Sequence, residues 1–377
     1  PEALMRFFLG GTRVLMVSGT HGKTTSTALM AHVLNSAGRD PSLLVGGVAR
    51  DFDKNYRLGR GADFVIEGDE YDTAFFDKGP KFLHYGARGA IVTAVEFDHA
   101  DIYRDLEHVK SSFRALTEQM DESCVLAVCA DSAAALEVTA AARARRVTYG
   151  LGGGELRAVD IRIDRDGARF SIERAGRRPA TDFRLSMGGR MNVANALGVY
   201  ALLSAFNVSD DEIARGFATF KGVARRQEVI GEAAGVVVID DFAHHPTAIA
   251  ATLEAVAERF AGQRILAAFE PRSNTSRRNV FQAEFARAFD RAARVYLAPV
   301  YFKDNDPIPD GERLDVNALA AELGGRGVVG LACESNDEVV EKILADARDG
   351  DVVVIMSNGP FDNLPRRLLA ALGEHER

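Results

Sequence analysis

Apolar segments of strand length alternate with helical segments along most of the 377 residues, and this alternation limits the possible folds most strongly. The first unit is Arg13–Ser18, then a glycine-containing turn, then a predicted helix from Thr24 to Ser36 that Gly38 ends. Strands that alternate with helices are typical of parallel sheets covered by helices. The sequence therefore predicts an α/β fold.

The alternating pattern falls into two blocks joined by a basic turn between Lys221 and Glu228. Strands of the first block are expected at 64–67, 90–95 and 124–129, with a hairpin of 159–164 and 168–174 and helices at 192–206 and 209–220. Strands of the second block are expected at 236–240, 265–270, 295–298, 328–332 and 352–356. Its helices are expected at 246–260, 280–292, 316–323, 337–347 and 363–372. We therefore predict two domains, residues 1–223 and 224–377, the first with a mainly parallel sheet and the second a Rossmann-like α/β domain.

Composition excludes several classes of protein. The chain is 47% apolar and 27% charged, which is an ordinary globular balance. No apolar segment approaches the roughly 18–20 residues that cross a bilayer, so no membrane partner is expected. A net charge of −8 argues against nucleic acid as a partner. Three cysteines without metal-binding spacing fit a reducing, cytoplasmic location.

The chain opens at Pro1 without an initiator Met, and residues 1–11 resemble a piece of something longer. We therefore expect an upstream domain to be missing. A monomer or weak dimer is expected for the chain itself.

The strongest local motif is Gly19-Thr20-His21-Gly22-Lys23-Thr24-Thr25 between the first strand and the first helix. Backbone N–H groups of such a loop and the helix N-terminus bind phosphate. Lys23 can reach the β- and γ-phosphates, and the Thr24 hydroxyl can ligate Mg²⁺. Val17 stands where the strict Walker A pattern has Gly, and the alternative is a glycine-rich turn with a surface lysine. We favour phosphate binding because the flanking strand and helix are correct.

Acidic residues follow the next two predicted strands. Glu67 directly ends an apolar strand, at the edge where α/β sites form. Asp69 and Asp72, which follow it, fit a solvated acidic loop equally well. The string Glu96-Phe-Asp-His99 ends the following strand, and His99 is by chemistry alone more often a hydrogen-bonding loop residue than a Mg²⁺ ligand.

Five motifs occur in the order and spacing of the Mur ligases, the ATP-dependent amide-forming enzymes of peptidoglycan synthesis. They are the loop at 19–25, Glu67-Gly-Asp-Glu-Tyr-Asp72, Glu96-Phe-Asp-His99, Gly189-Arg-Met-Asn-Val-Ala-Asn195 and Asp240-Asp-Phe-Ala-His-His-Pro246. The resemblance covers essentially the whole chain. It implies a central P-loop ATPase domain at 1–223 and the family's C-terminal domain at 224–377.

The resemblance assigns nucleotide and metal roles residue by residue. It implies that Lys23 and the loop backbone of 19–25 hold the ATP phosphates, and that Thr24 with Glu67 holds one Mg²⁺. It implies a second Mg²⁺ between Glu67 and His99. Asn195 corresponds to the residue that reads adenine, Arg226 to the arginine that reaches the phosphates, and Asp241 to the residue at the ribose.

The same resemblance implies an acceptor site in the C-terminal block. His244 and His245 would line the cleft. The residues expected to bind the incoming peptide follow strands: Arg272, Ser273, Asn274, Ser357 and Asn358. Polar residues after strands are as often plain loop residues. Ala94 and Met191 depart from the family's usual Asn and His, which suggests rearranged nucleotide contacts.

Residues 70–78 and the string Glu270-Pro-Arg-Ser-Asn-Thr275 resemble the strings of the family member that acts in peptidoglycan recycling. That member joins UDP-N-acetylmuramate to the tripeptide L-Ala-γ-D-Glu-meso-diaminopimelate through an acyl phosphate. Alternatives are addition of L-alanine to UDP-N-acetylmuramate, a folylpolyglutamate-type ligase, a P-loop NTPase switch and a kinase. Since the family places its UDP-binding portion ahead of the P-loop, we expect this chain alone to bind ATP without efficient ligation.

Overall fold

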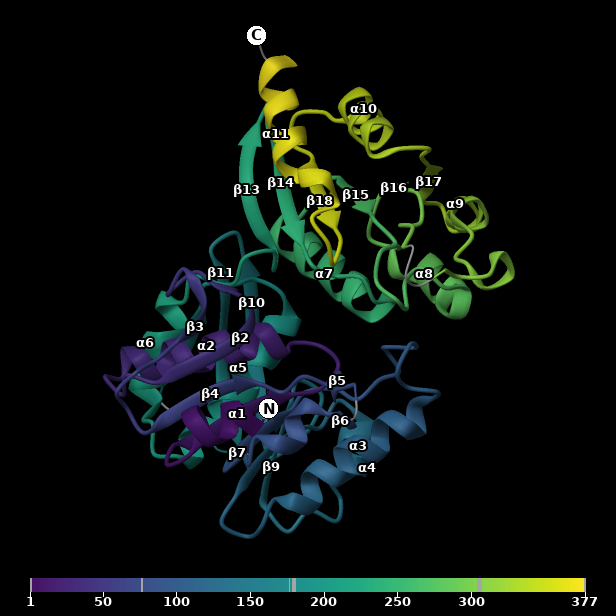
Figure 1. The fold of residues 1–377 in the computed structure, drawn as a ribbon. Coiled ribbons are helices and arrows are strands. Elements are labelled where there is room, and N and C mark those ends of the chain that lie inside the picture. Colours follow the sequence, from purple (N-terminus) through teal and green to yellow (C-terminus); the bar gives the residue numbers. More distant parts are fainter. Residues whose placement is uncertain (1, 76, 176, 178–180, 304–306, 376–377) are drawn as a thin grey trace. The chain divides into compact units, whose positions relative to one another are not determined.

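The computed structural model describes residues 2–75, 77–175, 177, 181–303 and 307–375 (Figure 1). Phe76, which belongs to the string at 70–78, lies outside these residues. The chain divides into two units, Pro1–Ala224 and Arg225–Arg377, and each is described by itself. Among the described residues, no helix has both the length and the apolar character that a bilayer crossing requires.

The first unit is built on a ten-stranded sheet with the order β12-β11-β10-β9-β8-β7-β1-β4-β2-β3. Neighbouring strands from β10 to β2 run parallel. Antiparallel strands extend the sheet at both edges, β11 and β12 on one side and β3 on the other. The strands are β1 (Arg13–Ser18), β2 (Ser42–Ala49), β3 (Lys54–Arg57), β4 (Asp63–Glu67), β7 (Gly89–Val92), β8 (Val125–Cys129), β9 (Arg145–Gly150), β10 (Leu156–Asp164), β11 (Gly167–Arg174) and β12 (Asp182–Leu185). A separate pair comprises β5 (Asp72–Ala74) and β6 (Asp77–Pro80).

Helices cover both faces of this sheet. They are α1 (Glu2–Leu4), the π-helix η1 (Met5–Leu9), α2 (Lys23–Ser36), the 3₁₀-helix η2 (Lys81–His84), α3 (Leu106–Gln119), α4 (Ala133–Val138), α5 (Arg190–Ala205) and α6 (Asp210–Thr219). Successive residues of β1 point to opposite faces, as a strand requires. Leu15 and Val17 join a core with α2, α5 and α6, whereas Val14 and Met16 join a core with α3 and α4. The sheet is thus buried on both sides, which explains its continuous apolar strands.

The second unit has a six-stranded sheet with the order β13-β14-β18-β15-β16-β17. Only β13 at one edge is antiparallel to its neighbour. The strands are β13 (Glu228–Ala233), β14 (Val236–Asp241), β15 (Ile265–Phe269), β16 (Arg294–Leu297), β17 (Val329–Ala332) and β18 (Val352–Met356).

Helices again form two layers around the second sheet. Apolar residues of α7 (Pro246–Arg259), α8 (Gln282–Ala288) and α9 (Val316–Gly325) share one core with the sheet. Those of α10 (Asn336–Asp346) and α11 (Leu364–His375) share the other. Short 3₁₀-helices complete the unit: η3 (Asn279–Phe281), η4 (Asp310–Glu312) and η5 (Phe361–Asn363). The predicted α/β fold class is confirmed.

Two predicted element boundaries are wrong. The strand expected at 90–95 ends at Val92, because the next residues pair with the loop after β1: Thr20 N–H donates to the Ala94 carbonyl at 2.7 Å. The helix expected at 280–292 is a 3₁₀ turn followed by seven residues of α-helix, because the chain turns after Ala288 to enter β16. The expected elements also omitted α3 and α4 and the strands β2, β3, β9 and β12, of which β3 and β12 lie at the edges of the sheet.

Candidate nucleotide and metal site

The loop between β1 and α2 requires glycine at two positions. Gly19 has a φ of 122° and Gly22 a φ of 80°, a backbone region that other residues rarely adopt. A Cβ on Gly19 would lie 2.2 Å from Thr93 Oγ1, and a Cβ on Gly22 would lie 2.3 Å from Asn195 Oδ1. The loop is therefore packed against the segment after β7 and against α5.

The loop begins later than the strict Walker A pattern predicts. Val17 is fully buried in β1, where it pairs with Glu67 of β4. The loop is fixed instead by Thr20, whose hydroxyl accepts a hydrogen bond from Glu96 N–H at 2.9 Å. It leads into the first turn of α2, where Thr25 is buried, and helix N-termini of this kind bind anions.

Lys23 is partly buried at the start of α2, and its ammonium has several partners. Its Nζ donates to the Gly19 carbonyl at 2.7 Å and the Thr20 carbonyl at 3.3 Å, and it forms an ion pair with Glu70 Oε2 at 2.6 Å. Burial alone lowers the pKa of this ammonium, but the carboxylates of Glu70 and Glu67 outweigh burial and raise the pKa above its ordinary value. Lys23 is therefore a permanent positive charge beneath the loop.

Thr24 and Glu67 form an oxygen-rich pair suited to Mg²⁺. The Thr24 hydroxyl donates to Glu67 Oε1 at 3.0 Å, and Gly46 N–H donates to Glu67 Oε2 at 2.7 Å. Mg²⁺ prefers hard oxygen ligands and is commonly held by one or two carboxylates together with phosphate oxygens. A hydroxyl and a carboxylate beside a phosphate-binding loop fit that ion.

His99 lies on the loop after β7 in a left-handed conformation, with a φ of 54°. Its backbone N–H donates to Asp98 Oδ1 at 2.7 Å, and its ring lies 4.3 Å from the ring of Tyr71. Its imidazole makes no hydrogen bond to Glu67 within the part of the chain that the structure describes. The geometry thus joins Thr24 to Glu67 directly, whereas His99 contacts the loop that follows Glu67.

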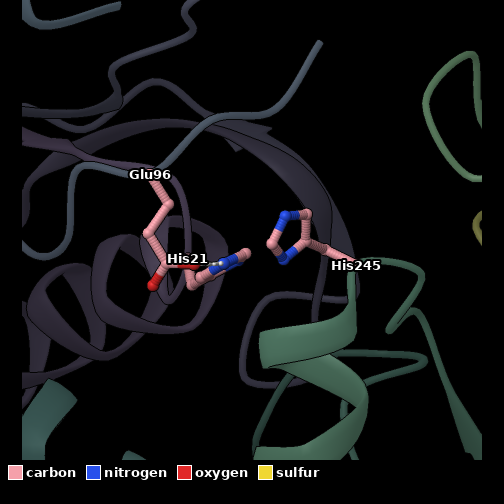
Figure 2. Close-up of side chains that lie close together, drawn as sticks. All are labelled: His21, Glu96 and His245. Carbon is pink, nitrogen blue, oxygen red and sulfur yellow. Dashed lines mark ion pairs between the residues drawn. The ribbon is translucent and has the colours of Figure 1, made fainter. Parts of the chain in front are cut away.

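His21 and Glu96 lie close together beside the phosphate-binding loop, as Figure 2 shows. Their closest atoms, Nε2 of His21 and Oε2 of Glu96, are 3.4 Å apart. His21 therefore contributes a side chain at the loop as well as its backbone. The third residue drawn in Figure 2, His245, belongs to the second unit.

Asn195 projects from α5 onto the loop. Its side chain is buried against Gly22, and its Nδ2 donates to Asn192 Oδ1 at 3.3 Å. At the departure Ala94, the backbone carbonyl accepts from Thr20 N–H at 2.7 Å, a contact that any residue type can make.

In the second unit, Arg226 lies just before β13, and Asp241 is the last residue of β14. The Arg226 guanidinium lies over the Phe242 ring at 4.5 Å from its centroid. Asp241 is buried and accepts hydrogen bonds from Gln227 N–H and Ala243 N–H, both at 2.7 Å. Burial raises the pKa of Asp241, with Arg226 opposing the shift. Its carboxylate therefore holds the turn at 225–228 in this structure.

His244 and His245 precede α7 and make local contacts. His244 Nδ1 lies 3.0 Å from the Phe242 carbonyl. His245 caps α7, because its Nδ1 accepts from Thr247 N–H at 3.3 Å, and its ring meets Phe281 edge-on. His245 thus has a structural role as a helix cap.

Arg272 is the charged residue among the five predicted to bind the incoming peptide, and its side chain is 22% exposed. Its guanidinium lies 3.6 Å from the centroid of Tyr301, and Nη1 lies 3.3 Å from Glu270 Oε1. A Cβ on Gly359 would lie 2.1 Å from Arg272 Nε, so a side chain there would displace the guanidinium. The guanidinium is thus held by Tyr301 and Glu270 while the side chain stays partly exposed, and guanidinium groups are suited to binding a carboxylate.

The other predicted acceptor residues lie on the same two loops. Ser273 and Ser276 bond to each other through their hydroxyls at 2.8 Å. Asn274 Oδ1 accepts from Lys303 Nζ at 2.6 Å, and the Ser357 hydroxyl donates to Glu270 Oε2 at 2.5 Å. Asn358 Oδ1 is buried with no hydrogen-bond partner among the described residues.

Comparison with known families identifies both units. Residues 17–203 match the Mur ligase middle domain, and residues 225–359 match the Mur ligase glutamate ligase domain. The chain belongs to the Mur ligase family. It is therefore a member of a family of ATP-dependent, amide-forming ligases of peptidoglycan synthesis, as the motifs predicted.

Two curated Mur ligases are similar over nearly the whole chain. The UDP-N-acetylmuramate–L-alanyl-γ-D-glutamyl-meso-2,6-diaminoheptandioate ligase of Haemophilus influenzae is 35% identical, over 99% of this chain and 79% of its own. The UDP-N-acetylmuramate–L-alanine ligase of Delftia acidovorans is 34% identical, over 99% of this chain and 77% of its own. The crystal structure of a murein peptide ligase from Psychrobacter arcticus is 31% identical with a TM-score of 0.70, over 98% of this chain and 79% of its own.

The structure brings together Lys23, Thr24, Glu67 and Asn195 around the predicted Mur ligase loop. Sequence reasoning missed two contributors to this site. Glu70 is 3% exposed and pairs with Lys23, although its position in an acidic string suggested a solvated loop. Gly46 contributes only its backbone N–H, and no motif marked it.

Proposed function

We propose that the chain joins UDP-N-acetylmuramate to the tripeptide L-Ala-γ-D-Glu-meso-diaminopimelate at the expense of ATP. The observation that supports ligation is the cluster of Lys23, Thr24 and Glu67 at the start of α2 in a Mur ligase fold. The choice of acceptor is supported by the 35% identity with the H. influenzae ligase, whose name specifies this peptide.

In the first proposed step, a carboxylate oxygen of the muramate attacks the γ-phosphorus of ATP. The bond from this phosphorus to the bridging oxygen breaks, which yields an acyl phosphate and ADP. Lys23 and the loop N–H groups stabilise the charge on the transferring phosphoryl group, since such catalysis is mainly positioning and electrostatics. Mg²⁺ held by Thr24 and Glu67 would add further charge neutralisation, and Glu67 with His99 is our candidate pair for a second ion.

In the second proposed step, the peptide amine attacks the acyl carbon, and phosphate leaves after a tetrahedral intermediate. The amine loses a proton as the amide forms. We assign the acceptor carboxylate to Arg272, with Ser273, Asn274, Ser357 and Asn358 as neighbours. Asn195, Arg226 and Asp241 are proposed nucleotide contacts, and His244 and His245 are proposed to line the substrate site. Asp241 would have to exchange a backbone hydrogen bond for the ribose.

A second candidate is addition of L-alanine to UDP-N-acetylmuramate, because several relatives of 31–35% identity carry that name. The test is acceptor-dependent ADP release with UDP-N-acetylmuramate, with the tripeptide and free L-alanine compared at equal concentrations. The chain is assayed as it stands and with the upstream region of its relatives restored. Amide product with the tripeptide, identified by mass, supports the proposal. With the upstream region restored, product with L-alanine alone, or phosphate release that neither acceptor stimulates, contradicts it.

A further inference from the structure

A segment of β2 connects the proposed metal carboxylate to the end of the first unit. We propose that Gly46 N–H positions Glu67, and that residues 46–51 couple occupancy of the metal and phosphate site to the chain segment 219–224. The proposal rests on the metal role given to Thr24 and Glu67 under the proposed function. Gly46 is a positioning residue in it and does not touch substrate.

The first contact is between Gly46 and Glu67. Backbone pairing of β2 with β4 covers Ser42–Leu44 and does not continue to Gly46. At Gly46 the N–H therefore meets a side chain, and it donates to Glu67 Oε2 at 2.7 Å while Thr24 holds Oε1. Two donors on different elements thus fix the orientation of one carboxylate.

A side chain at position 46 would crowd the Glu67 carboxylate. A Cβ there would lie 3.1 Å from Glu67 Oε2 and 3.3 Å from Oε1, so that the carboxylate would have to shift by a few tenths of an ångström. A shift of that size changes how a carboxylate presents its oxygens to a cation, since second-layer contacts set ligand orientation.

The next residue, Gly47, lies between the phosphate site and the segment 219–224. A Cβ on Gly47 would lie 2.9 Å from Val223 Cγ1 and 3.0 Å from Thr24 Cγ2. Thr24 and Val223 therefore both approach the Cβ side of the same glycine. A movement of the Thr24 side chain would therefore change the packing of Val223 against this glycine.

Hydrogen bonds then hold residues 219–224 to the end of β2. Ala224 N–H donates to the Val48 carbonyl at 2.9 Å, and Arg50 N–H donates to the Gly222 carbonyl at 3.0 Å. The two stretches thus form a short antiparallel pairing, with a further bridge between Ala49 and Val223.

A buried His–Asp pair secures the other end of this segment. Asp51 Oδ2 accepts from Lys221 N–H at 3.0 Å, and Asp51 Oδ1 lies 3.0 Å from His32 Nδ1. His32 belongs to α2, the helix that carries Lys23 and Thr24, and its Nε2 lies 2.9 Å from Thr219 Oγ1. Both α2 and β2 therefore link the phosphate site to residues 219–224.

The first experiment measures binding of Mn²⁺, as a probe for Mg²⁺, by electron paramagnetic resonance in the presence of a non-hydrolysable ATP analogue. We expect Gly46→Ala to raise the Mn²⁺ dissociation constant about 10-fold. Gly153→Ala is the matched control, because a Cβ there meets nothing within 4 Å, and it should bind Mn²⁺ as the parent chain does. Unchanged binding in Gly46→Ala would overturn the positioning role.

The second experiment measures amide hydrogen exchange at 219–224 and 48–51 with and without Mn²⁺ and the analogue. In the parent chain, ligand should slow exchange at Arg50 and Ala224. In Val223→Ala, which removes the methyl groups facing Gly47 without adding volume, the slowing should be lost while Mn²⁺ still binds. If exchange in the parent chain is the same with and without ligand, the coupling is overturned. If the parent chain binds no Mn²⁺, the proposed function is overturned as well.

Discussion

Lys23 and Glu70 form the most buried ion pair of the phosphate site, with 13% and 4% of the side chains exposed. A buried pair of this kind contributes little net stability, but removing one partner leaves an uncompensated charge. Because the pKa of Lys23 is raised, its charge contributes stability that is complete below the ordinary lysine pKa and is lost as the pH rises through the raised value.

Glu70→Gln should therefore destabilise the first unit by about 3 kcal/mol at neutral pH. Urea denaturation followed at several pH values measures this. The deficit should stay constant from neutral pH to about 10 and shrink above the ordinary lysine pKa of about 10.4. Asp69→Asn is the control, since Asp69 pairs with Lys81 near the surface and such pairs contribute less than about 1 kcal/mol. Equal losses of unfolding free energy in the two variants would contradict the effect assigned to burial of the Lys23–Glu70 pair.

Gly22 and Gly38 form a matched pair for testing the phosphate-binding loop. Both have positive φ, 80° and 75°, but a Cβ on Gly22 meets Asn195 whereas one on Gly38 meets nothing within 4 Å. Alanine at either position should cost about 1–2 kcal/mol of backbone strain. Only Gly22→Ala should also weaken binding of a fluorescent ATP analogue, measured by titration. Equal weakening in both variants would mean that strain, and not the contact with Asn195, is responsible.

At the scale of elements, the loops after β15 and β16 run beside each other. Tyr301 N–H donates to the Pro271 carbonyl at 2.9 Å, Tyr301 packs on Arg272, and Lys303 bonds to Asn274. Adjacent parallel strands end at the same edge of a sheet, so their loops meet there. These contacts hold the two loops together at one edge of the second sheet, where we propose that the acceptor binds.

Arg272→Ala should raise the KM for the peptide acceptor about 10- to 100-fold, because loss of a hydrogen bond to a charged group weakens binding by about this factor. The KM for ATP should not change. Steady-state kinetics with varied acceptor measures both values. Arg291→Ala is the control, because Arg291 pairs with Glu254 on the surface. An unchanged acceptor KM in Arg272→Ala would remove this residue from the acceptor site.

The sequence allowed prediction of elements that carry a periodic apolar pattern, such as β1, β14, β18 and α7. It did not reveal β2 or β3, because Gly46, Gly47 and the polar residues of β3 interrupt any apolar alternation. In the candidate site, too, some residues could be predicted from the sequence and others could not. Lys23, Thr24 and Glu67 belong to motifs, whereas the contribution of Gly46 is a backbone N–H that any residue type possesses. Burial of Glu70 depends on tertiary packing around Lys23, which no local pattern records.

At the scale of the whole molecule, each unit has its own pair of apolar cores, one on each face of its sheet. Leu253→Ala, at a fully buried position of α7, should cost about 2–5 kcal/mol through the cavity that it leaves. Hydrogen exchange measured by mass spectrometry should show faster exchange in 225–377 and unchanged exchange in 13–203. Uniformly faster exchange would mean that the two units unfold as one.

The chain is fastened on both sides of the junction between Ala224 and Arg225. Ala224 is tied to Val48, while Arg225 N–H donates to Glu228 Oε2 at 2.8 Å and its carbonyl accepts from Phe242 N–H at 2.8 Å. The Arg225 guanidinium also donates to the carbonyls of Ser357 and Gly359, both at 2.5 Å. The last anchor of the first unit and the first anchor of the second are therefore carried by consecutive residues, so that a single peptide group joins them.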